Sequence, residues 1–182
     1  PHIGVFILSI TDKWSGTILP DSYTFEYYGR VFSESVSYIS IKNSFLYSIG
    51  SVIVDLVLGL TIAYLLTRTK IKGKGFLDGL AMLPLSLPGI VLAFGYISTY
   101  SGSFIDPLEN PTILLVISYA FRRLPYMVRS AYAGFQQSSI YLEEAARNLG
   151  ASSLLIIRKI TLPLITANMI AGGILCFAYA ML

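Results

Sequence analysis

The sequence predicts an all-α protein, a polytopic bundle of transmembrane helices. Hydrophobic residues make up 54% of the chain and charged residues only 13%, whereas soluble domains usually carry about 25% charged residues. The mean hydropathy of +0.68 agrees with this composition. The apolar residues fall into blocks separated by short charged stretches, which is typical of helical membrane proteins and not of a soluble α/β core.

The chain opens with two elements that lie before the first full span. Residues 1–10 are apolar but too short to cross a bilayer, and they lack the basic start and cleavage site of a signal peptide. We expect them to be the end of a clipped span. Residues 12–43 carry several aromatic side chains, which favour the headgroup level of a membrane. We expect a partly helical extracytoplasmic segment along the membrane surface, with an ordinary packed loop as the alternative.

Four membrane spans follow, because a helix needs about 20 apolar residues to cross the hydrocarbon. They cover residues 44–67, 76–100, 112–133 and 164–182. Pro84, Pro88 and Gly89 lie inside the second span, where prolines remove helix hydrogen bonds and bend the axis. We expect a bend there, and Pro125 predicts a similar break in the third span.

The charged loops set the orientation of these spans. Residues 68–74 carry four Lys and Arg residues, whereas residues 101–110 carry none. Residues 12–43 carry three cations against four acids, and residues 134–163 carry Arg147, Arg158 and Lys159. Because Lys and Arg concentrate in cytoplasmic loops, segments 68–74 and 134–163 are predicted inside and the other two outside. The loops alternate correctly for a multi-pass protein of a bacterial or archaeal cytoplasmic membrane.

The inner loop, residues 134–163, predicts two short helices separated by a glycine stop. Gly150 suits the left-handed position that ends a helix, and Pro163 suits the first turn of the next one. An apolar stripe at helical spacing precedes the stop, and its members are Leu142, Ala145, Ala146 and Leu149. A stripe of small residues with a charged flank suits a groove on a partner protein.

This loop also carries a specific pattern, Glu144-Ala145-Ala146, three residues, Gly150, nine residues, then Ile160-x-Leu162-Pro163. The pattern resembles the EAA loop of type I ABC importer permeases, and the flanking Arg122-Arg123-Leu124-Pro125 fits the same family. The resemblance implies a helical bundle of that kind, a fragment with about five of the usual six spans, one clipped and the last absent. In the family this loop forms coupling helices that sit in a cleft of the ATPase. The implied docking residues are Glu143, Glu144, Ala145, Ala146, Leu149, Gly150, Ile160, Leu162 and Pro163.

The resemblance implies an ATP-driven importer with several partners. These are ABC ATPase subunits, which hold ATP and Mg, an extracytoplasmic solute-binding protein, membrane lipid, and a second permease unit that is identical, similar or fused in the same chain. The chain itself has no phosphate-binding Gly-x-x-x-x-Gly-Lys-Ser/Thr string. We therefore expect no cofactor on this chain, and a transport subunit, not an enzyme.

Other site chemistry has little support in the sequence. The lone His2 and the lone Cys176 supply neither catalytic residues nor a metal site, which also argues against an intramembrane enzyme. The net charge of +3 comes with no basic patch interleaved with aromatics, so nucleic acid binding is not expected. An ion-coupled secondary transporter is the alternative: it accounts for a charge inside a span but not for the EAA-like loop.

Charges near mid-membrane mark the candidate translocation path, since they are costly there and usually face partners or water-filled cavities. They are Asp55, Arg122 and Arg123. We expect Asp55 to pair with one arginine. Two alternatives stay open: the arginines lie nearer the inner surface, or one of them lines the path and favours an anionic solute. Ser86 and Pro88 at the predicted bend are further path candidates, with a kinked packing helix as the alternative.

The transported substrate is the least constrained feature. The Pro-x-x-Gly-Val opening, Tyr27-Tyr28 and the Arg122-Arg123-Leu124-Pro125 segment are similar to permeases of the ferric iron, thiamine, polyamine and phosphonate group. We expect ferric iron, and the other solutes of this group remain alternatives.

Overall fold

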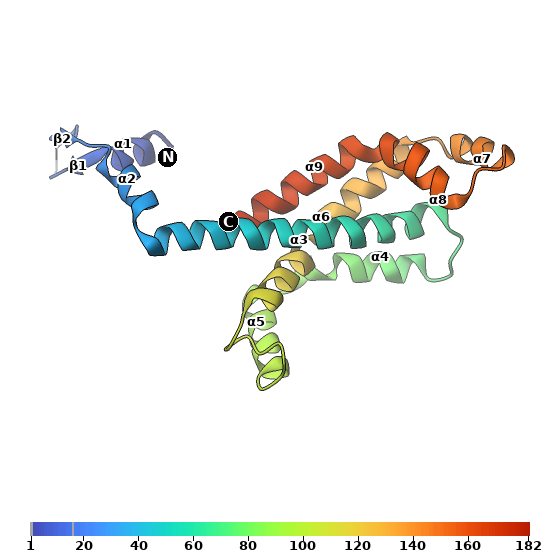
Figure 1. Ribbon diagram of the computed structural model, residues 1–182, viewed down its shortest axis with the longest axis horizontal. Coiled ribbons are helices and arrows are strands. Elements are labelled where there is room, and N and C mark those ends of the chain that lie inside the picture. The colour runs from blue at the N-terminus through green and yellow to red at the C-terminus, as the bar shows by residue number, and fades with distance from the viewer. Residues whose placement is uncertain (1, 16) are drawn as a thin grey trace. The chain divides into compact units, whose positions relative to one another are not determined.

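The computed structural model describes residues 2–15 and 17–182 (Figure 1). Within these residues the protein is helical apart from one two-stranded hairpin, which confirms the predicted all-α class. The chain divides into two compact units, Pro1–Ser44 and Phe45–Leu182. Each unit is described by itself.

The first unit combines short helices with the hairpin. It contains α1 (His2–Ser9), β1 (Thr11–Lys13), β2 (Ser22–Tyr23) and α2 (Glu26–Ser33). The strands pair antiparallel, with Thr11 opposite Tyr23. The hydroxyls of Ser9 and Tyr28, 2.7 Å apart, join α1 to α2. Helix α2 agrees with the expected partly helical segment, whereas the hairpin was not predicted.

Helix α3 (Ser35–Arg68) is longer than the first predicted span, which was placed at residues 44–67. No proline or glycine lies between residues 35 and 43, so nothing ends the helix at the expected boundary. Among the described residues, α3 is one of two helices that are long and apolar enough to cross a membrane, and the other is the continuous helix Ser153–Met181. The Lys74 ammonium donates to the carbonyl of Leu66 at 2.8 Å. Leu66 lies in the last turn of α3, where backbone carbonyls have no hydrogen-bond partner within the helix.

The second predicted span, residues 76–100, is not one straight helix. It consists of α4 (Lys74–Met82), a 3₁₀ turn η1 (Leu83–Ser86) and α5 (Gly89–Tyr100). The two parts meet at 100°, the geometry of a broken span or a re-entrant loop. The bend falls at the predicted place, because Pro84 and Pro88 cannot donate a backbone hydrogen bond and the intervening Leu87 is extended.

The connection between α5 and the next helix, within residues 101–110, is closed by one carboxylate. Asp106 accepts hydrogen bonds from the backbone N–H of Gly102 at 2.6 Å and of Leu108 at 2.8 Å. These bonds favour the charged form and lower the pKa of Asp106 below its usual value. They also set the course of the chain between α5 and α6.

Helix α6 (Thr112–Gln137) begins where the third span was predicted and continues past residue 133. Pro125 lies inside it and does not end it, so the chain remains helical where a break was predicted. Pro125 is fully buried. Helix α6 carries Arg122, Arg123 and Arg129, and it is not among the helices apolar enough to cross a membrane by composition.

The remaining elements are short until the last helix. They are α7 (Ile140–Asn148), α8 (Ser153–Ile156), the π-helical turn η2 (Ile157–Thr161) and α9 (Leu162–Met181). Helix α9 covers the fourth predicted span, 164–182, and begins slightly earlier. Helices α3, α6 and α9 lie side by side in the second unit (Figure 1).

Glycines allow these three helices to approach closely around Met127 of α6, which is fully buried. A Cβ atom on Gly59 of α3 would lie 2.9 Å from Met127 Cβ. A Cβ atom on Gly172 of α9 would lie 2.8 Å from Ser130 Cβ. Ser130 also donates a 2.5 Å hydrogen bond to the carbonyl of Asn168. Small residues at such contacts are how membrane helices pack without a hydrophobic driving force between them.

Replacing Gly172 with alanine therefore tests the three-helix contact. Gly172→Ala should lower the free energy of unfolding by about 1–3 kcal/mol, because the added methyl group overpacks the site. The matched control is Gly95→Ala on α5, where a Cβ meets no atom within 4 Å; it should be neutral or stabilising. Thermal unfolding of the detergent-solubilised protein measures both. Equal effects of the two substitutions would contradict the close approach.

Candidate functional site

Helix α7 and its glycine stop form the core of the predicted coupling loop. Gly150 has φ +85°, in the left-handed region that favours glycine. The N–H of Ala151 donates to the carbonyl of Ala146, and the N–H of Gly150 donates to the carbonyl of Arg147, both at 3.0 Å. This pair of bonds is a Schellman motif, which satisfies the last carbonyls of the helix. The predicted helix stop is observed at the predicted residue.

The apolar stripe of α7 is open to its surroundings. We call it the docking stripe, and it consists of Leu142, Ala145, Ala146 and Leu149. Leu149 is 89% exposed and Leu142 is 49% exposed. Ala145 is exposed and Ala146 is half-buried. The motif residue Glu144 is also exposed. An exposed apolar stripe on a short helix is available for a protein partner.

Glu143 does not belong to this exposed surface, which corrects its assignment as a docking residue. It is only 7% exposed, and its Oε1 accepts a hydrogen bond from Nε of Arg68 at 3.0 Å. At 100° per residue, Glu143 lies about 60° beyond Ala146, which is the nearer edge of the docking stripe. The structure therefore gives Glu143 a partner on α3.

The end of the motif contributes to packing more than to the surface. Leu162 packs against the core cluster of Ala63, Phe135 and Ile165, and Ile160 is half-buried. Pro163 is exposed. It has no backbone N–H to donate to a carbonyl one turn earlier. The π-helical turn Ile157–Thr161 ends two residues before it. Of the predicted docking residues in this part, only Pro163 is open.

The predicted pairing of Asp55 with an arginine is not formed. Asp55 of α3 is fully buried, and neither of its carboxylate oxygens has a hydrogen-bond partner within residues 2–15 and 17–182. Arg123 instead donates to the carbonyl of Tyr179 and lies 5.6 Å from the centre of the Tyr179 ring. Cys176 donates to the carbonyl of Arg123 at 3.4 Å. Contacts with α9 thus hold Arg123 away from an ion pair with Asp55.

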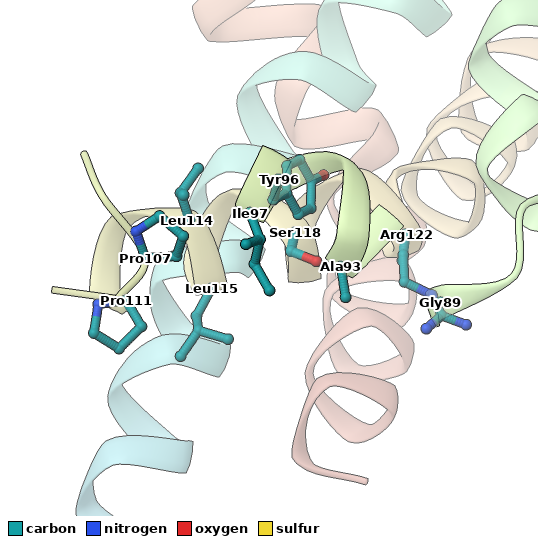
Figure 2. A pocket seen from close by; sticks show the side chains of 10 residues that line it. All are labelled: Gly89, Ala93, Tyr96, Ile97, Pro107, Pro111, Leu114, Leu115, Ser118 and Arg122. Carbon is teal, nitrogen blue, oxygen red and sulfur yellow. The ribbon is translucent and has the colours of Figure 1, made fainter. Parts of the chain in front are cut away.

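Arg122 takes a different direction from Arg123 and lines a pocket between α5 and α6. The cavity has a volume of about 210 Å³. Figure 2 shows Arg122 beside Gly89 at one end of the pocket, with Pro107 and Pro111 at the other. A Cβ on Gly89 would lie 2.5 Å from Nη1 of Arg122, so the glycine leaves room for the guanidinium. Tyr96 and Ser118 add hydroxyl groups to a mostly apolar lining.

The other path candidates lie at the bend between α4 and α5. Ser86 ends the 3₁₀ turn, and Pro88 directly precedes α5. Both side chains are exposed, and neither lines the pocket beside Arg122. No cluster of three or more metal-ligating side chains occurs in the part of the chain that the structure describes.

Sequence reasoning missed the role of Arg68 and of Ser138. Arg68 counted only as one cation of an inner loop, yet it ends α3 and donates to Ser138 at the end of α6 and to Glu143 of α7. One signal was present: the charges of the loops predict that Arg68 and Glu143 lie on the same side of the membrane. Opposite charges at one membrane face can pair, but sequence does not show which of several partners is adjacent.

The fold and the loop together define a class: a polytopic helical membrane protein that carries a short helix with an exposed apolar stripe before its last long helix. The chain belongs to the family described as binding-protein-dependent transport system inner membrane component, which matches residues 55–182. This confirms the predicted type I ABC importer permease family and a multi-pass location in the cytoplasmic membrane.

Several curated relatives are similar over much of the chain. The molybdate/tungstate transport system permease protein WtpB of Pyrococcus furiosus is 29% identical over 89% of this chain and 64% of its own length. The ferric transport system permease protein FbpB of Actinobacillus pleuropneumoniae is 29% identical over 97% of this chain. The sulfate transport system permease protein CysT of Salmonella typhimurium is 32% identical over 66% of it. The chain spans 26% of the length of FbpB and 47% of CysT.

The unpartnered carboxylate of Asp55 leads to a stability prediction. Asp55→Asn should raise the unfolding midpoint of the purified protein by ~2–4 °C, which corresponds to roughly 1 kcal/mol for a chain of this size. The reason is that it removes a buried carboxylate that has no hydrogen-bond partner in the described part of the chain. The control is Asp78→Asn, since Asp78 accepts from Arg129 at 3.1 Å; it should leave the midpoint unchanged or lower it slightly. A lower midpoint for Asp55→Asn would show that the carboxylate has a stabilising partner.

Proposed function

We propose that this chain forms part of the solute path of an ATP-driven ABC importer and docks a cytoplasmic ATPase through α7. The observation that carries the proposal is the docking stripe, which is exposed on a helix whose other side is tied to the membrane helices. Amphipathic helices bind grooves of partner proteins through anchors at this spacing. Membership of a binding-protein-dependent transport family supports the same role.

The proposed machine divides the work between chains. The ATPase subunits hold ATP and Mg and hydrolyse the nucleotide, and an extracytoplasmic binding protein delivers the solute. A second permease unit, identical, similar or fused, completes the path. Exposed residues of the loop supply the contact, and they are Glu144, Ala145, Leu149, Gly150 and Pro163. The path itself is proposed beside the bend at Ser86 and Pro88 and the pocket that holds Arg122.

For the substrate we propose an inorganic ion, with ferric iron as the first candidate. The ferric relative aligns with 97% of this chain. Relatives named for molybdate/tungstate and sulfate support a second candidate, an oxyanion. Arg122 favours this second candidate, because a guanidinium beside hydroxyl groups suits an anion.

A charge placed on the docking stripe tests the ATPase contact. Ala145→Arg in the full-length permease should reduce co-purification of the ATPase roughly tenfold, because a buried unpaired charge at an interface costs at least 1.4 kcal/mol. Asn148→Arg adds the same charge to an exposed position of α7 off the stripe and should change co-purification little. Wild-type association and ATP-dependent uptake in Ala145→Arg would overturn the docking proposal. Uptake that needs an ion gradient and no ATP would favour a secondary transporter.

A transport assay identifies the substrate. The reconstituted transporter with its binding protein should take up radiolabelled ferric iron in an ATP-dependent manner and leave molybdate and sulfate outside. Uptake of an oxyanion without iron would overturn the iron assignment, and Arg122→Gln should then lower that uptake. Uptake of a polyamine, thiamine or a phosphonate instead would overturn the proposal of an inorganic ion.

A further inference from the structure

Arg68 makes a set of contacts that no other cation of the described chain makes. Its Nε donates to Oε1 of Glu143 at 3.0 Å. Its Nη2 donates to the carbonyl of Ser138 at 2.9 Å and to the Ser138 hydroxyl at 2.7 Å. The guanidinium carbon lies 5.5 Å from the centre of the Phe135 ring. We call this cluster, Arg68, Phe135, Ser138 and Glu143, the inner clamp.

The inner clamp is buried and its polar groups are well satisfied. The side chains of Arg68 and Glu143 are each only 9% exposed. Ser138 also donates to the carbonyl of Phe135 at 3.1 Å, which fixes its hydroxyl. A planar guanidinium donates in fixed directions, so these bonds specify an orientation as well as a distance. The clamp is therefore a rigid joint and not a solvated surface pair.

The position of the clamp in the fold matters more than its strength. Arg68 is the last residue of α3, Ser138 directly follows α6, and Glu143 lies in the first turn of α7. Among the described residues, the bond to Arg68 is the one side-chain hydrogen bond that α7 makes. The docking stripe lies on the same short helix. Any displacement of α7 thus acts directly on the inner end of α3.

We propose that the inner clamp couples α7 to α3, with Arg68 as a positioning residue that passes movement of the docked helix into the transmembrane helices. This inference rests on the proposed docking of an ATPase at α7. It adds that docking and coupling are carried by different faces of α7: the stripe binds the partner, and Glu143 transmits the movement. Arg68 contacts neither the ATPase nor the solute in this arrangement.

The test compares two substitutions that each remove a positive charge at or just after the end of α3. Arg68→Met removes the clamp, and Lys70→Met removes an exposed cation from the same loop. Each full-length permease is reconstituted with its ATPase and binding protein. Three quantities are measured: ATPase association, ATP hydrolysis, and solute taken up per ATP hydrolysed. Arg68→Met should keep ATPase association while uptake per ATP falls roughly tenfold, within the range typical of coupling between two sites. Lys70→Met should keep all three.

A second variant distinguishes a loss of coupling from a loss of folding. Arg68→Met leaves Glu143 buried without a partner, whereas Arg68→Met with Glu143→Leu replaces the whole pair by apolar groups, which is often neutral for stability. This double variant should fold and bind the ATPase but still lose uptake per ATP, because apolar contacts lack the directed bonds. Wild-type uptake per ATP in the folded double variant would overturn the coupling role. Failure of the unmodified permease to bind the ATPase would overturn the docking proposal and, with it, this inference.

Discussion

The arrangement of the second unit depends on the close approach of α3, α6 and α9 around Met127. Gly59 and Gly172 have no side chains, and the space that a Cβ would need is occupied by Met127 and Ser130. In lipid, the apolar surfaces of helices gain little from leaving their surroundings, so shape and hydrogen bonds decide which helices associate. Beyond this contact, Arg68 at the end of α3 reaches Ser138 and Glu143.

Two buried carboxylates in the same unit, Glu143 and Asp55, differ in whether they have a hydrogen-bond partner among the described residues. Glu143 is held by Arg68, and removal of one partner of such a buried pair costs roughly 3–5 kcal/mol because the other charge is left without compensation. Asp55 is completely buried and its oxygens have no hydrogen-bond partner in the described part of the chain. Charged groups inside a membrane are costly and usually mark functional positions, which is the role predicted for Asp55. The first carboxylate thus has a charged partner that compensates it, whereas the second has no partner among the described residues.

Helix α7 separates two tasks on one short element. Its docking stripe is exposed, its glycine stop turns the chain sharply, and its first turn is bonded to α3. A partner that moves the stripe must move the joint as well, since the guanidinium bonds resist rotation. The Arg122 pocket lies between α5 and α6, whereas the joint lies where the ends of α3 and α6 meet α7. The proposed coupling joint and the proposed solute path therefore occupy different regions of the same unit.

The sequence by itself determined the helical class, the stop at Gly150 and the position of the bend near Pro88. These features follow from local rules: apolar periodicity, positive φ at glycine and the missing N–H of proline. It did not determine the 100° bend, the burial of Glu143, or the turn of Arg123 toward Tyr179 and away from Asp55. Each of these depends on which side chains of distant helices are adjacent. The sequence predicts opposite charges at similar depth, but only the packing of α3, α6 and α9 decided which side chains meet.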